Sequence, residues 1–251
     1  MWKHPEDNTQ AIITAQKHIE SCHGGENLIL PETAILFYMH SGEKFVKSHY
    51  RTKLLTKSFP RFLSSCPVYQ IKGRNICFLD GGRGAPQAVD TLETLAALGV
   101  KNVITVGMFG AFSEEIESGD IVIPNKAFVE EGTSLHYYSS IEYSQPSEEL
   151  LRKAAEYITD SKLMPIVSTD AVYRQTFFKE ELWRQKGAVG VDMETSALLS
   201  VGAYLNINIV SILIASDKHP LNENDRSWKW TMTKEKRYEF FRKCLKFAES
   251  I

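Results

Sequence analysis

The sequence has few of the features that mark a membrane or secreted protein. It contains four cysteines among 251 residues, scattered without a Cys-x-x-Cys pair. No apolar run reaches the roughly 18 residues expected of a membrane span. Residues 1–7 lack the apolar core of a secretory signal. We therefore expect a cytoplasmic protein with reduced thiols and no membrane partner.

Charge of one sign is not in excess either. The chain has 29 lysines and arginines against 31 acidic residues, a formal net charge of -2, which argues against a nucleic-acid surface built on phosphate attraction. Low-complexity tracts and internal repeats are also absent from the sequence. With 43% hydrophobic residues the chain can bury a large core. We expect one domain over residues 1–251 that binds a small molecule.

Apolar runs of strand length alternate with helical patterns, which predicts an α/β fold. The predicted strands cover residues 34–38, 76–79, 103–106, 121–123, 127–129, 164–167 and 209–215. The predicted helices cover residues 86–98, 147–159, 179–185, 193–205 and 233–247. Parallel strands joined by crossover helices bind ligands at the carboxyl ends of the strands. We therefore expect a three-layer sandwich, with a central twisted mixed sheet flanked by helices and the site in the loops.

Two acidic residues border the most apolar unit of the chain. Glu194 stands beside the apolar helix pattern of residues 195–203, where an unpaired charge would be costly. Asp217 follows the buried-strand pattern of residues 209–215. Two carboxylates at the edges of one apolar unit predict a site.

Glycine-rich turns follow two of the predicted strands. Gly82 and Arg83 belong to a turn that opens a helix, so the turn's amides would face an anion. The same glycines would equally serve an ordinary strand-to-helix turn, and the missing third glycine argues against a dinucleotide fingerprint. Gly107 and Met108 follow the next strand, where glycine permits close approach of a ligand.

Aromatic and polar residues gather in two further loops. Tyr137 and Tyr138 follow His136, and such rings stack on flat ligands while hydroxyls bond their edges. Tyr173 and Arg174 lie in a second loop after a short strand. The alternative for the first loop is that His136 is an ordinary packed histidine. The alternative for the second is an ordinary capped loop. Lysines and arginines upstream are expected on one solvated helix face: Lys47, Arg51, Lys53 and Lys57.

Taken in order, these motifs resemble the nucleoside phosphorylase superfamily, which contains purine nucleoside phosphorylases, uridine phosphorylases and methylthioadenosine-type nucleosidases. The likeness spans roughly residues 76–217 and comprises segments 82–86, 98–100, 106–111, 118–124, 131–137, 169–174, 191–194 and 216–217. It implies a nucleoside phosphorylase-like fold and a homodimer or homohexamer. It also implies inorganic phosphate as co-substrate, with neither an organic cofactor nor a metal.

The resemblance assigns roles to the residues already singled out. The family breaks the glycosidic bond through an oxocarbenium-like transition state, in which Glu194 would hold the ribose hydroxyls and place negative charge near the cation. Met193 would pack against the sugar. Asp217 matches the acid that protonates purine N7, which requires burial to raise its pKa. Tyr173 and Tyr137 would line the base.

The chain departs from the family at the phosphate contacts. Residues 37–44 replace the usual Gly-Asp-Pro-x-Arg-like loop, and Thr105 and Met108 stand where an arginine and a hydroxyl are usual. Backbone amides and the remaining guanidinium groups would bind phosphate instead. The expected phosphate-binding residues are Gly82, Arg83, Gly107, Met108 and Arg174.

The predicted function is a nucleoside phosphorylase that converts a purine-type nucleoside and phosphate to pentose 1-phosphate and free base. Thr176 and Phe178 stand where uridine phosphorylases grip a pyrimidine, which disfavours a pyrimidine substrate. One alternative is a hydrolytic nucleosidase, although no Gly-Ala-Met-Glu-Glu-like match lies near the first strand. Another is a nucleoside-binding protein without turnover, but simple binding has less need of an acid such as Asp217.

Overall fold

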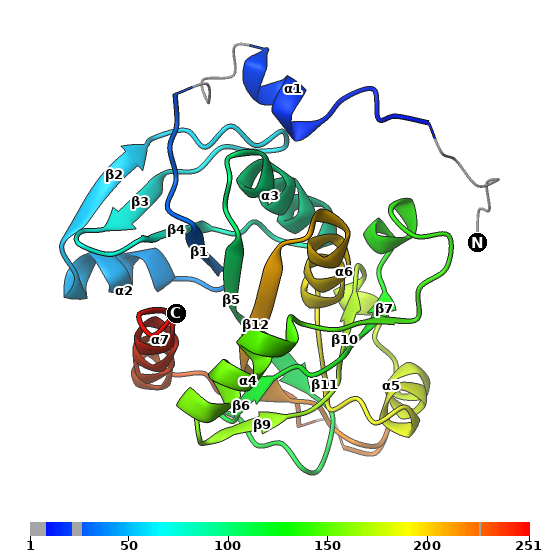
Figure 1. Ribbon diagram of the computed structural model, residues 1–251. Coiled ribbons are helices and arrows are strands. Elements are labelled where there is room, and N and C mark those ends of the chain that lie inside the picture. The colour runs from blue at the N-terminus through cyan, green and yellow to red at the C-terminus, as the bar shows by residue number, and fades with distance from the viewer. Residues whose placement is uncertain (1–8, 22–26, 226) are drawn as a thin grey trace.

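The central sheet is built on four long neighbouring strands. The computed structural model describes residues 9–21, 27–225 and 227–251 (Figure 1). In the described part, four parallel strands lie in the order β4 (Ile76–Asp80), β1 (Thr33–Phe37), β5 (Asn102–Ala111) and β12 (Asn208–Lys218). Their carboxyl ends therefore meet at one edge, as the sequence predicts.

Strand β5 is the branch point of the sheet. Its first half pairs with β1, whereas Gly110 and Ala111 pair antiparallel with β11 (Gly190–Asp192). From β11 the sheet continues through β10 (Ile166–Thr169), β7 (Ala127–Glu130) and β8 (Tyr143–Ser144). The remaining strands of the sheet are β2 (Thr52–Thr56), β3 (Val68–Ile71), β6 (Ile121–Ile123), β9 (Ser161–Leu163) and β13 (Lys229–Trp230).

Helices cover both faces of the sheet because its central strands are buried on both sides. Along β1, Ala34 and Leu36 enter one hydrophobic core, and Ile35 and Phe37 enter the other. The first core lies under α3 (Ala85–Ala97) and α6 (Thr195–Leu205), which run side by side in Figure 1. The second lies under α2 (Gly42–His49), α4 (Glu148–Tyr157) and α7 (Lys234–Ala248). The predicted three-layer sandwich is thus confirmed.

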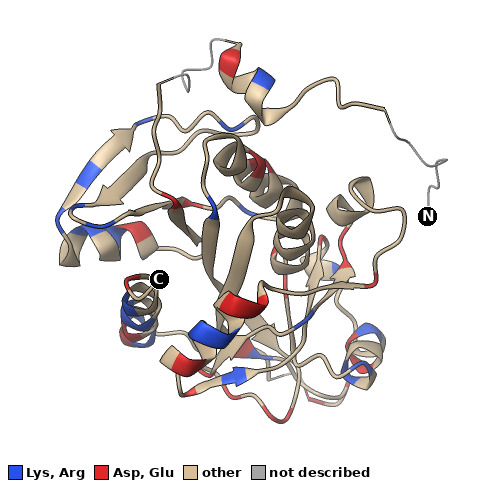
Figure 2. Ribbon diagram, viewed as in Figure 1, with Lys and Arg blue, Asp and Glu red and all other residues tan. Residues whose placement is uncertain are grey.

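The remaining helical segments lie at the margins. They are α1 (Ala15–Glu20), α5 (Phe177–Gln185), and the short 3-10 helices η1 (Thr133–His136) and η2 (Val172–Arg174). Among the described residues, none of the helices combines the length and apolar character needed to cross a membrane. Basic and acidic residues are interspersed on α4, α5 and α7 (Figure 2).

One segment differs from its prediction. The basic residues from Lys47 to Lys57 do not share one helix face, because α2 ends at His49 and Lys53 lies in β2. The hairpin of β2 and β3 is only partly buried, so it lacks the continuous apolar run that would have marked its strands.

Candidate functional site

Two predicted motifs meet where α3 and α6 begin. Glu194 is the N-cap residue of α6, and its Oε1 accepts a hydrogen bond of 2.7 Å from the backbone N–H of Gly84, 110 residues earlier in the chain. Gly84 has a φ of +77°, which glycine adopts without strain. The glycine turn therefore serves as a partner for the Glu194 carboxylate in this structure.

The Glu194 carboxylate lies in an environment that disfavours its charge. Burial raises its pKa to about 7, and the nearby charge of Asp192 adds to the effect. Asp192 is itself buried and accepts hydrogen bonds of 2.5 Å from the hydroxyls of Ser168 and Thr195. A ligand that donates hydroxyl hydrogen bonds to Glu194 would stabilise its ionised form.

Asp217 approaches the same end of β5 from the other side. Gly110 of β5 is the register partner both of Val191 in β11 and of Asp217 in β12. Two interstrand spacings, about 10 Å, therefore separate Asp217 from Val191. Glu194 follows Val191 by three residues. The register shift between Ala215 and Asp217 is a β-bulge, a device that re-aims side chains beside functional sites.

The Asp217 carboxylate is surrounded by donors. Its Oδ2 accepts a hydrogen bond of 2.6 Å from the indole Nε1 of Trp228 and lies 3.3 Å from Nε2 of His219. Ser216 donates to Oδ1 at 2.5 Å. Burial raises the pKa of Asp217, but the hydrogen bonds from His219, Ser216 and Trp228 outweigh it and lower the pKa. Asp217 is therefore ionised in this state, contrary to the expectation that burial would keep it protonated.

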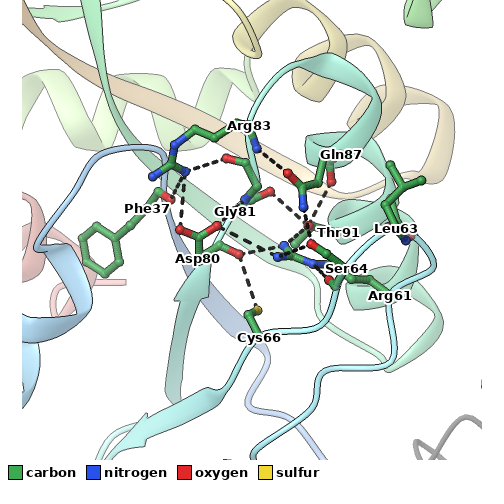
Figure 3. Close-up of polar contacts among 12 residues, drawn as sticks. Phe37, Arg61, Leu63, Ser64, Cys66, Asp80, Gly81, Arg83, Gln87 and Thr91 are labelled. Atoms are coloured by element: carbon green, nitrogen blue, oxygen red, sulfur yellow. Dashed lines mark hydrogen bonds and ion pairs between the residues drawn. The ribbon is translucent and has the colours of Figure 1, made fainter.

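The predicted phosphate residues Gly82 and Arg83 are engaged with Asp80. The N–H of Gly82 donates to Asp80 Oδ1 at 2.8 Å. Arg83 Nη1 lies 3.4 Å from Asp80 Oδ2 and donates to the Gly82 carbonyl at 2.6 Å (Figure 3). Half-exposed and already paired, Arg83 would have to exchange these contacts to bind an anion.

Arg61 is a buried cation of this region that sequence reasoning missed. Its Nη1 donates to the Asp80 carbonyl at 2.9 Å and to the Thr91 hydroxyl at 2.7 Å (Figure 3). A signal was present, because Arg61 is the one charged residue between Lys57 and Lys72 in the sequence.

Tyr38 fills the space between the two glycine turns. A Cβ at position 81 would lie 2.3 Å from Cζ of Tyr38, and one at position 107 would lie 3.5 Å from Cβ of Tyr38. The phenol oxygen is buried, with no hydrogen-bond partner among the described residues. Burial and the charge of Glu194 raise the pKa of Tyr38 well above its usual value. The Tyr38 ring therefore lies against Gly81, and its Cβ lies beside Gly107, next to the place predicted for phosphate.

Two other predicted phosphate residues lie elsewhere. Met108 packs against the core under α2 and α7, while the neighbours of Gly107, Tyr38 and Leu213, belong to the opposite core. Alternation along β5 thus places Met108 and Gly107 on opposite faces of the sheet, and their binding of phosphate stays a prediction. Arg174 is exposed on η2, in a loop held to the Gly132 amide by Asp170 at 2.8 Å.

The aromatic residues predicted to line the base are not gathered at the two acids. The Tyr173 side chain is on the surface, with the residue 95% exposed. The Tyr137 hydroxyl donates to Glu93 at 3.0 Å, and its ring packs edge-on against Tyr204. Tyr204 lies ten residues beyond Glu194 along α6, about 15 Å at the helical rise. Tyr137 and Tyr173 thus lie away from Glu194 and Asp217, whereas Met193 lies partly buried next to Glu194.

The chain is similar to known proteins in sequence and in structure. The phosphorylase superfamily matches residues 47–246. The DeoD-type purine nucleoside phosphorylase of Clostridium novyi (strain NT) is 30% identical over 152 residues, 58% of this chain and 65% of that protein. The chain thus matches just under two thirds of this relative. The DeoD-type purine nucleoside phosphorylase of Thermoanaerobacter sp. (strain X514) is 26% identical over 186 residues, 72% of this chain and 77% of that protein.

Two solved structures share the fold. The AMP nucleosidase from Bacteroides thetaiotaomicron VPI-5482 superposes with a TM-score of 0.73 at 23% identity, covering 94% of this chain and 98% of that one. The purine nucleoside phosphorylase from Toxoplasma gondii, in complex with immucillin-H, superposes with a TM-score of 0.74 at 20% identity, covering 89% and 92%. Because the family match extends over most of its length, the chain belongs to the phosphorylase superfamily.

Proposed function

We propose that this protein cleaves the N-glycosidic bond of a purine-type nucleoside and releases the free base. The observation that carries the proposal is the register at Gly110, at the carboxyl end of β5, which has Asp217 as one partner and Val191, three residues before Glu194, as the other. In the proposal, a sugar joined to a heterocycle would lie between the two acids. Glu194 would meet the sugar and Asp217 the base.

At the sugar end, substrate binding would change the ionisation of Glu194. Its raised pKa leaves the carboxyl partly protonated near neutral pH. Two ribose hydroxyls donating to the carboxylate would favour the charged form. The negative charge would then stand beside the sugar as positive character develops there, which is the preorganised arrangement that accelerates such reactions. Met193, next in sequence, would contact the apolar side of the sugar.

At the base end, Trp228 supports a purine. Its indole is a planar heterocycle whose N–H donates to Asp217 Oδ2 at 2.6 Å. The N7–H of a departing purine is a donor of the same kind, and a pyrimidine has no N7. Trp228 is 54% exposed, so a ligand can reach this oxygen by displacing a surface side chain.

The acceptor of the sugar has two candidates. The sequence predicts phosphate as the acceptor and pentose 1-phosphate as the product, and the named relatives are phosphorylases. One observation favours water: Tyr38 packs beside both glycine turns, with its ring against Gly81 and its Cβ near Gly107, next to the place where phosphate was expected. With Arg83 also paired to Asp80, hydrolysis is the candidate that the geometry supports better.

A base-release assay over a panel of purine and pyrimidine nucleosides, run with and without inorganic phosphate, tests the proposal. Release that needs phosphate, accompanied by pentose 1-phosphate, selects phosphorolysis. Equal release without phosphate selects hydrolysis. No release from any nucleoside under either condition would contradict the proposal and favour the binding protein. The homodimer or homohexamer implied by the resemblance stays a prediction, which analytical ultracentrifugation measures directly.

A further inference from the structure

Three side chains near the base end form one line of contacts. His219 lies between two carboxylates, with Nδ1 at 2.7 Å from Glu180 Oε1 and Nε2 at 3.3 Å from Asp217 Oδ2. Glu180 belongs to α5 and Asp217 to β12, so the histidine joins two elements. All three side chains are largely buried. Nothing in the sequence pattern marked Glu180 or His219.

Both ring nitrogens of His219 face an acceptor. A neutral imidazole carries one N–H and would turn a lone pair toward one of the carboxylates, whereas the imidazolium donates on both sides. Burial lowers the pKa of His219, but hydrogen bonds to Asp217 and Glu180 outweigh it and raise the pKa to about 9. The geometry therefore favours the doubly protonated imidazolium ring at neutral pH.

The other neighbours of His219 are consistent with this charge state. From α5, Arg184 lies 4.0 Å from Glu180 Oε2 and also donates to the Phe112 carbonyl at 3.1 Å. From β5, Gly110 makes room for the ring, because a Cβ there would lie 2.5 Å from Nε2 of His219. The carboxylates that face the ring are thus Glu180 and Asp217, with the Arg184 cation behind Glu180.

We propose that His219, positioned by Glu180, is the proton reservoir for the leaving base and acts through Asp217. This inference rests on the proposed function, because it assigns the source of the proton that a departing purine takes at N7. Asp217 alone is not that source, since the hydrogen bonds it accepts keep it ionised. The base would take the place of the Trp228 indole on Oδ2.

The proton balance of this step closes within the site. As the glycosidic bond breaks, its electron pair passes to the base, and the acceptor, water or phosphate, bonds to the sugar carbon. His219 Nε2 gives its proton to Asp217 Oδ2, and Asp217 gives that proton to N7. The base leaves neutral, Asp217 is again a carboxylate, and His219 is a neutral imidazole until water reprotonates it. Glu180 stays ionised throughout and orients the ring through Nδ1.

A first experiment needs no substrate and is independent of the proposed function. Nitrogen-15 NMR of the histidine ring measures the ionisation of His219 in the intact protein between pH 5 and pH 10. We expect an imidazolium at pH 7 in the wild type, and a midpoint at least 1 pH unit lower in Glu180→Gln. A neutral His219 ring at pH 7, or an unchanged midpoint in Glu180→Gln, would overturn the proposal.

A second experiment separates proton delivery from a structural role. A purine nucleoside needs its leaving group protonated, whereas 4-nitrophenyl riboside releases a stable anion without an acid. We expect His219→Gln to lower kcat on the purine nucleoside by about 10²-fold and to change the rate on 4-nitrophenyl riboside by less than about 5-fold. The matched control is His49→Gln, an exposed histidine at the end of α2.

The outcomes of the second experiment are distinct. Equal losses on both substrates would mean that His219 only supports the fold, and unchanged rates on both would mean that it has no role; either overturns the inference. A wild type that releases no base from any nucleoside would contradict the proposed function instead, and the NMR titration would still decide whether the ring carries the proton.

Discussion

Replacing Glu194 by glutamine separates the effect of a buried charge on protein stability from its effect on turnover. Glutamine keeps the shape of the side chain and an oxygen that accepts the 2.7 Å hydrogen bond from Gly84. It cannot ionise, so it removes the charge that burial and Asp192 disfavour. We therefore expect the Glu194→Gln protein to be less active but, at alkaline pH, more stable than the wild type.

The magnitude follows from the shift in pKa. A carboxyl whose folded pKa is raised binds protons more tightly in the native state than in the unfolded state. The free energy of unfolding therefore falls as pH rises from the unfolded pKa of 4.5 through the folded pKa of about 7. Such a shift corresponds to about 3 kcal/mol, shared with the charge of Asp192. At pH 8 we expect the variant to be more stable by about 1–3 kcal/mol.

Urea unfolding at pH 5 and at pH 8 measures this effect, and base release from the active nucleoside measures turnover. We expect turnover to fall by about 10²-fold in Glu194→Gln. Glu114→Gln, the same change at an exposed turn, is the control and should leave both quantities unchanged. If wild type and Glu194→Gln lose equal stability between the two pH values, burial does not raise the pKa of Glu194 and the reasoning is wrong.

Three further substitutions test other parts of the site. Asp217→Asn should lower turnover on purine nucleosides by about 10²-fold in steady-state kinetics, and a wild-type rate would remove Asp217 from the mechanism. Tyr38→Phe deletes a buried hydroxyl that has no partner among the described residues, so urea unfolding of the ligand-free protein should show no loss, or a gain of up to about 1 kcal/mol; a clear loss would mean that the hydroxyl is bonded. Arg61→Ala removes the buried guanidinium that donates to the Asp80 carbonyl and the Thr91 hydroxyl and should cost about 3 kcal/mol in the same assay. Arg74→Ala, at an exposed ion pair, is its control, and equal small losses in the two variants would contradict the buried role of Arg61.

The elements that the sequence predicted well are those buried on both faces. Strand β1 has every residue buried, and such strands are continuous apolar runs. The weakest predictions concerned the partly exposed hairpin of β2 and β3, whose residues alternate too irregularly to identify a strand.

Within the site, the sequence identified the carboxylates and the glycine turns but not what they contact. Glu194 and Gly84 both came from recognised motifs, yet the hydrogen bond between them spans 110 residues and has no local signature. Tyr137 has the right chemistry for a base pocket, and the fold turns it toward Glu93 instead.

The sequence by itself determined the order of the buried strands and of the helices that pack on them, and which residue types stand at the strand ends, because apolar periodicity and turn chemistry depend on neighbours along the chain. Only the tertiary structure decided that the Tyr38 ring packs against Gly81, that Asp217 accepts hydrogen bonds from Ser216 and Trp228, and that His219 lies between two carboxylates. Packing and ionisation depend on neighbours in space, and those neighbours come from α5, β5 and β12, which are distant in the sequence.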